Sequence, residues 1–364
     1  MYFFFATHSC YRIKLMRFDS SKYRIWKRRQ NDKNLEKRTE RKVKSKRRKT
    51  AIHKSNVALK TNAFYDSTTK KYSFKAPSNF SIVSNPRETL IAFNALLSHI
   101  KNNSSVHKEI FVDVKEVEDL TIDSIMYLLC FLNNFNKADR YRFSGNYPID
   151  LKARKTFLDS GFNKYVKSRV PKTLLRQTDN VQITSGDNID TSLAKRIVDF
   201  IKSNAKSENK YHYIYEMVIE LMGNTWKHAY NNDANRLFDS CWYCYVEIEN
   251  SKAKITFMDT GIGIPRSIYK KKGELIKEKM DLFNLVKDSE YIASALRGEE
   301  RTETRLSNRG KGLPSFVEIV NEDYIQKLRI ISLNGDVCVE KDKITALDLD
   351  KKFFGTLYYW EINL

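Results

Sequence analysis

Three side chains of one predicted helix, Glu220, Asn224 and His228, are spaced four residues apart. At 3.6 residues per turn this spacing rotates each side chain only about 40° from the last, so the three form one polar row. The amide oxygen of Asn224 can ligate Mg²⁺, which prefers hard oxygen ligands and shares its coordination shell with phosphates. Glu220 can take a proton from an attacking water. The row predicts a metal-assisted hydrolytic site, and a helix face turned to solvent is the alternative.

A second candidate segment ends a predicted strand, where Asp259 is followed by Gly261 and Gly263. A carboxylate at a strand end can accept a hydrogen bond from the exocyclic amine of adenine. The two glycines permit positive φ and carry no side chains that would keep a flat base away. The segment predicts a base-binding loop, and an ordinary turn after a strand is the alternative.

A third segment contains Gly310, Lys311 and Gly312 just before a predicted helix at 313–321. Bare backbone N–H groups at a helix N-terminus attract phosphate, and the lysine adds positive charge. The spacing of a Walker A loop is absent. This segment predicts a phosphate contact, whereas a fourth fragment, Gly355-Thr356, predicts nothing by itself.

The order of the four segments is more specific than any one of them. In the chain they follow one another as Glu220-x-x-x-Asn224-x-x-Lys227-His228, Asp259-x-Gly261-x-Gly263, Gly310-x-Gly312 and Gly355-Thr356. This order resembles the N, G1, G2 and G3 boxes of the GHKL ATPase superfamily, which includes gyrase, heat-shock chaperone, mismatch-repair and histidine-kinase ATPases. The resemblance covers about residues 190–364, and residues 264–309 fall where that superfamily carries a mobile ATP lid.

The resemblance implies ATP and Mg²⁺ as cofactors and a role for each box. It implies Glu220 as the general base, Asn224 as the Mg²⁺ ligand and Asp259 as the adenine contact. The other implied ATP contacts are Gly261 and Gly263 beside the base, Gly310, Lys311 and Gly312 at the phosphates, Lys227 and His228 near phosphate, and Thr356 in support of the adenine site. Because none of the six histidines lies in a His-Glu/Asp-Leu-Arg context, we do not expect a histidine autokinase.

The predicted elements divide the chain into four parts. An α+β domain at 189–364 combines helices at 190–204, 210–229 and 313–321 with strands at 242–248, 253–258, 328–333, 336–340 and 355–362. Helices on one face of a mixed, largely antiparallel sheet are expected, which is the Bergerat sandwich that the resemblance implies. A smaller α/β domain at 71–168 is predicted from its alternating strands and helices, with a linker at 169–188 and a basic tail at 1–70.

The smaller domain is similar, more loosely, to STAS domains, the partners of anti-sigma kinases. Asp113-x-x-x-Val117-x-x-Leu120 and the helix predicted after it carry this similarity. In phosphorylated STAS domains a serine pair begins that helix, and here Asp123 falls near the phosphoacceptor position. A structural α/β domain is the alternative reading.

Residues 12–49 hold 18 Lys and Arg against four Asp and Glu, a net charge of +14 out of +21 for the chain. Such a run favours an electrostatic arm for nucleic acid, with an anionic membrane surface, an acidic partner or a plain solvated tail as alternatives. No apolar stretch approaches the roughly 20 residues of a membrane helix, so membrane insertion is not expected. The opening Tyr2–Ala6 is too short for a secretory signal. Together with five scattered cysteines, this predicts a cytoplasmic protein.

The leading hypothesis is an ATP-binding and ATP-hydrolysing GHKL-type switch whose lid controls an unidentified protein partner or self-association. One alternative is a serine/threonine kinase of the anti-sigma type that uses the same pocket. Another is a nucleic-acid-binding protein that acts through the basic tail.

Overall fold

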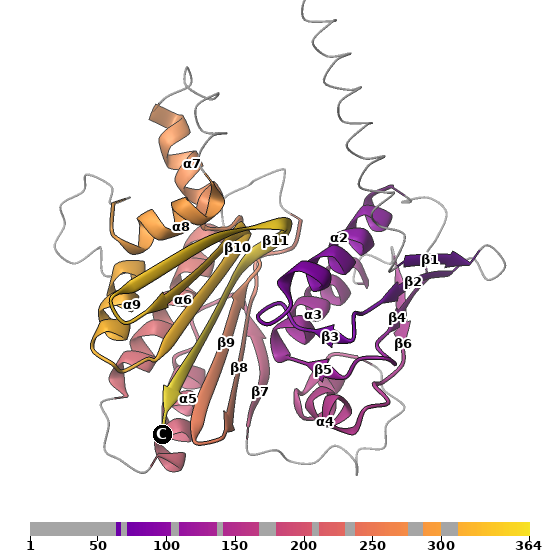
Figure 1. The fold of residues 1–364 in the computed structure, drawn as a ribbon, viewed down its shortest axis with the longest axis horizontal. Helices are drawn as coiled ribbons and strands as arrows, with labels where there is room; N and C mark the ends of the chain where they lie inside the picture. The colour runs from indigo at the N-terminus through magenta and orange to yellow at the C-terminus, as the bar shows by residue number, and fades with distance from the viewer. Residues whose placement is uncertain are drawn as a thin grey trace, which may run out of the picture. The chain divides into compact units, whose positions relative to one another are not determined.

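The computed structural model describes residues 63–66, 71–102, 109–136, 141–166, 180–205, 211–229, 237–275, 287–299 and 312–364. Over these residues the fold is α+β, with eight α-helices and sheets of five, four and two strands (Figure 1). Contacts group Asn62–Leu364 into one unit. Most of the predicted basic tail lies outside the described residues, but Ala63–Asp66 forms a strand. The prediction of a tail to residue 70 was therefore wrong at its end.

The first lobe, residues 63–166, is built on a four-stranded sheet of order β1-β2-β4-β6. β1 pairs with β2 in antiparallel fashion, and the other pairs are parallel. Its strands are β1 (Ala63–Asp66), β2 (Lys71–Lys75), β3 (Asn79–Phe80), β4 (Glu109–Asp113), β5 (Asp119–Leu120) and β6 (Arg142–Gly145). Its helices are α2 (Pro86–Asn102), α3 (Ile122–Asn136), α4 (Leu151–Asp159) and the short 3₁₀ helix η1 (Phe162–Lys164). The parallel strands need helical crossovers, and α2 and α3 supply them.

The second lobe, residues 180–364, contains a five-stranded sheet of order β10-β11-β9-β8-β7. Every pairing described in it is antiparallel. Its strands are β7 (Val181–Gly186), β8 (Trp242–Glu249), β9 (Lys252–Asp259), β10 (Lys327–Glu340) and β11 (Lys343–Asn363). Its helices are α5 (Thr191–Asn204), α6 (His212–Ala229), α7 (Ile264–Leu275), α8 (Asp288–Leu296) and α9 (Gly312–Asn321). This confirms the predicted α+β class and the antiparallel character of the sheet.

Both faces of the five-stranded sheet are buried. Trp242, Cys244 and Val246 of β8 belong to the core that α5 and α6 share. Tyr243 and Tyr245 alternate with them and belong to the core formed with α2 and α3 of the first lobe (Figure 1). Because successive side chains of a strand point to opposite faces, this alternation explains why β8 is apolar at consecutive positions. The sequence predicted helices on one face, and the structure adds the first lobe on the other.

Two boundaries differ from the prediction. β7 lies inside the segment expected to be a linker and pairs with β8 as an edge strand. The strand was not predicted because its sequence, Val-Gln-Ile-Thr-Ser-Gly, is largely polar, and an edge strand needs few apolar side chains. β10 and β11 form one long hairpin rather than short separate strands, and register shifts between Ser332 and Gly335 produce the apparent break.

Two helices begin at aspartate caps. The Asp150 carboxylate accepts a hydrogen bond from the Ala153 amide at 2.8 Å, and the Asp190 carboxylate accepts one from the Leu193 amide at 2.9 Å. Two hydrogen bonds to the Asp190 carboxylate, from the Ser192 hydroxyl and from the Leu193 amide, hold the pKa of Asp190 below its usual value. Such caps satisfy amides that a helix N-terminus leaves unpaired. None of the described helices is long and apolar enough to cross a membrane.

Candidate functional site

The strands β9 and β11 bring two of the predicted boxes together. Asp259 is the last residue of β9, and Thr356 of β11 is its paired neighbour. Gly355, just before Thr356, has φ +121°, and a Cβ there would collide with the Asp259 carbonyl oxygen. Only glycine combines this backbone conformation with so close an approach. The segment Gly355-Thr356, which predicted nothing alone, therefore lies directly beside Asp259.

The loop after Asp259 is held by the chain's own polar groups. The Gly261 amide donates to the Asp259 Oδ1 atom at 2.8 Å, which orients the carboxylate. Of the two loop glycines, Gly263 alone has positive φ, at +87°. A Cβ on Gly263 would lie 2.9 Å from the Ser332 Oγ atom. We expected both glycines to leave room for a base, but at Gly263 the protein fills that space itself.

Ser332 of β10 is a site residue that the sequence analysis missed. Its hydroxyl donates to the Gly355 carbonyl at 2.8 Å and accepts from the Ile264 amide at 3.1 Å. Its oxygen also lies 3.2 Å from the Thr356 hydroxyl. Ser332 thus ties the end of the Asp259 loop to β11. The signal available in the sequence was one serine within the apolar run Ile330-Ile331-Ser332-Leu333, since a buried hydroxyl needs partners.

The helices α6 and α9 bring a third and a fourth predicted residue to this place. Glu220 of α6 is half-buried, and a Cβ on Gly312, the first residue of α9, would lie 3.7 Å from its Oε1 atom. Tyr358 of β11 is buried and senses the charges of both carboxylates, Asp259 and Glu220. Burial raises the pKa of Tyr358 well above its usual value, and the charges of Asp259 and Glu220 add to the effect. Glu220 therefore lies beside Gly312, and Asp259 beside Thr356, and the charges of both carboxylates reach the buried Tyr358.

The described residues offer hard oxygens for Mg²⁺ but not a closed metal cage. Asn224 is half-buried on α6, one turn after Glu220. No group of three or more His, Cys, Asp or Glu side chains in the described part of the chain could hold a metal ion. Mg²⁺ that is shared with phosphates needs only one or two protein oxygens. The donor set therefore fits a metal held jointly with a nucleotide.

Several predicted ATP contacts cannot be located. Gly310 and Lys311 lie outside the described residues. Lys227 and His228 lie within α6, but their side chains are outside the described set. Their predicted roles near phosphate remain predictions.

The described part of the predicted lid at 264–309 consists of two helices. α7 begins directly after Gly263, and α8 lies on the β10–β11 hairpin. The Asp288 carboxylate accepts from the Asn334 amide, and the Ser289 amide donates to the Asp348 carboxylate, both at 3.0 Å. Together with the bond from the Ile264 amide to Ser332, these contacts anchor the starts of α7 and α8 to the β10–β11 hairpin.

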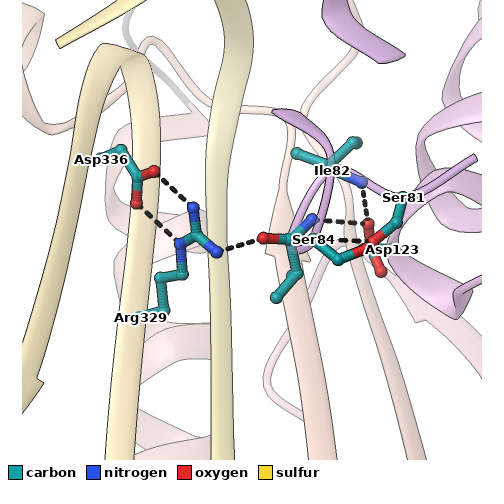
Figure 2. Close-up of polar contacts among 7 residues, drawn as sticks. Ser81, Ile82, Ser84, Asp123, Arg329 and Asp336 are labelled. Carbon is teal, nitrogen blue, oxygen red and sulfur yellow. Dashed lines mark hydrogen bonds and ion pairs between the residues drawn. The ribbon is translucent and has the colours of Figure 1, made fainter. Parts of the chain in front are cut away.

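In the first lobe, the position near the expected phosphoacceptor is buried. Asp123 is 2% exposed and Ser124 is fully buried. The Asp123 Oδ2 atom accepts hydrogen bonds from the amides of Ile82 and Val83, at 2.5 and 3.2 Å (Figure 2). Burial raises the pKa of the Asp123 carboxyl, and these bonds oppose the rise. Asp123 therefore organises a neighbouring loop in this structure.

No protein-family model matches this sequence, and a search of curated proteins finds no significantly similar one. Function is therefore inferred from the residues and their arrangement.

Proposed function

We propose that residues 189–364 form an ATP-binding and ATP-hydrolysing domain of the GHKL type. The observation that carries the proposal is that one residue from each predicted box takes part in two neighbouring pairs, Glu220 with Gly312 and Asp259 with Thr356, whose two carboxylates both act on the buried Tyr358. An antiparallel sheet with α5 and α6 on one face also supports it. In this account the nucleotide sets the position of the lid at 264–309, and the lid controls a partner or self-association.

Each residue has a role that its position allows. The Asp259 carboxylate, oriented by the Gly261 amide, accepts a hydrogen bond from the 6-amino group of adenine. The amide end of α9 at Gly312 faces the phosphates. Asn224 would hold Mg²⁺, which neutralises charge that develops on the phosphates. Glu220 takes a proton from the attacking water while the water oxygen forms a bond to the γ-phosphorus. The bond from that phosphorus to the bridging oxygen breaks, and ADP leaves with the electron pair.

The first lobe is assigned to a STAS-like fold on the motif from Asp113 to Leu120 and on the order β1-β2-β4-β6. Since Asp123 and Ser124 are buried, a docking or structural role suits it better than phosphoryl acceptance. Phosphorylation of a separate partner protein would use the same pocket, with a hydroxyl in place of water.

Selection between ATP and GTP tests the proposal. Guanine presents a carbonyl oxygen where adenine presents an amine, so Asp259 would face an acceptor instead of a donor. We expect the full-length protein to bind ATP with Mg²⁺ about 10- to 100-fold more tightly than GTP, because a hydrogen bond to a charged group is lost. Calorimetric titrations with both nucleotides, repeated with EDTA, measure this. Equal affinities would contradict the role of Asp259, and no binding of either would contradict the proposed function.

A further inference from the structure

Helix α3 belongs to the first lobe, yet two of its side chains hold backbone on both sides of Asp259. The Tyr127 hydroxyl accepts a hydrogen bond from the Phe354 amide at 3.1 Å, directly before Gly355. The Asn134 Oδ1 atom accepts one from the Asp239 amide at 2.6 Å. The Asp239 carbonyl in turn accepts from the Thr260 hydroxyl at 2.5 Å, next to Asp259. One helix of the first lobe therefore fixes both chain segments that flank the candidate base contact.

Aromatic rings of α3 also pack against a recess on the first-lobe side of the Asp259 loop. Phe238 and Phe354 line this recess together with Thr260 and Gly261. The Phe238 ring lies 5.1 Å from the ring of Phe131 and 6.0 Å from that of Tyr127, both on α3. The walls behind the loop are therefore held by rings of the first lobe, and a shift of α3 would move them.

The other end of α3 is fastened to the second lobe by a chain of polar contacts (Figure 2). Asp123 holds the amides of Ile82 and Val83, as described above. The Val83 carbonyl accepts a hydrogen bond from the Arg329 guanidinium of β10. Asp336 of the same strand binds that guanidinium through both carboxylate oxygens, at 2.8 and 2.5 Å. α3 is thus attached to the five-stranded sheet near both of its ends.

We infer that α3 is a positioning element of the nucleotide site, which sets the affinity for ATP by holding the backbone around Asp259 through Tyr127 and Asn134. The inference rests on the proposed function, because it concerns the same site. Glu220 lies on α6, which packs on the opposite face of the sheet from α3. Loss of the α3 contacts should therefore loosen the base contact and leave the hydrolytic step largely intact. The first lobe then acts as a built-in regulator of nucleotide affinity.

The test uses two single variants of the full-length chain and two matched controls. Tyr127→Phe removes one hydroxyl but keeps the ring, and Asn134→Ala removes the bond to Asp239. Tyr147→Phe removes a hydroxyl that bonds Asn163 within the first lobe. Asn204→Ala removes an amide that, like Asn134, donates to the carbonyl four residues earlier, but that lies at the end of α5. Kinetics of phosphate release give KM and kcat for each protein.

We expect KM for ATP to rise about three- to tenfold in each α3 variant, because the loosened loop spends only part of its time in the conformation that binds ATP, while kcat stays within about twofold. Both controls should keep the wild-type KM. Amide hydrogen exchange without nucleotide should speed up at Gly261 in Tyr127→Phe but not in Tyr147→Phe. Wild-type KM in both α3 variants would overturn this inference and leave the proposed function standing. A wild-type protein that neither binds nor hydrolyses ATP would overturn both.

Discussion

The Asp259→Asn variant is expected to bind ATP with Mg²⁺ about 10- to 100-fold more weakly than the wild-type protein. A hydrogen bond to a charged group contributes about 1.5 to 3 kcal/mol, and each 1.4 kcal/mol is tenfold in affinity. Asparagine keeps one oxygen that can accept from the Gly261 amide, so the turn after β9 should survive. It replaces the second oxygen with an NH₂ donor, which meets the adenine amine unfavourably. Calorimetric titration measures the loss.

The matched control is Asp342→Asn. Asp342 is exposed in the turn between β10 and β11 and has φ +57°, a conformation that asparagine tolerates. This variant should bind ATP as the wild-type protein does. Thermal unfolding of both variants checks that the fold is intact. If a folded Asp259→Asn protein bound ATP with wild-type affinity, Asp259 would not be a contact of the nucleotide.

The Glu220→Gln variant should still bind ATP but should release phosphate about 100- to 10,000-fold more slowly, the usual contribution of a general base. Glutamine matches glutamate in size, so it should fit the same place beside Gly312, but its amide cannot take the proton of water. Single-turnover phosphate release after mixing with ATP measures the rate, and calorimetry under the same conditions measures binding.

Glu216 provides the control for this second variant, because it lies one turn earlier on the same helix and is exposed. Glu216→Gln should leave both binding and turnover unchanged. If Glu220→Gln released phosphate at the wild-type rate, Glu220 would not be the base, and the helix face turned to solvent would be the better reading of the polar row.

The elements that the sequence predicted well are those with a long apolar period. The apolar stripe of α6 placed Glu220 on a helix, predicted at 210–229 and observed at His212–Ala229. The apolar run of β9 placed Asp259 at the end of a strand. Some polar elements were missed. β7 has too few apolar residues to stand out, and in α7 the run Lys270-Lys271-Lys272 interrupts the period.

The candidate site was partly predictable for the same reason. Glu220, Asp259 and Gly312 lie in local patterns whose chemistry follows from residue type and spacing, whereas Thr356 was predicted only through the resemblance. Ser332, Tyr127 and Asn134 contribute through contacts between elements distant in the chain. A lone serine, tyrosine or asparagine in an apolar element carries no local pattern that names its partner, so only the packed structure reveals these contacts.

The central claim, that one end of the five-stranded sheet holds ATP, is tested most directly by amide hydrogen exchange of the full-length protein with and without ATP and Mg²⁺. Exchange should slow at residues 260–263 after Asp259 and at the amides of residues 312, 313, 315 and 316 at the start of α9. It should not change at residues 249–252, the turn at the other end of β9. Slowing confined to the basic residues 12–49, or no slowing at either predicted segment, would contradict the account.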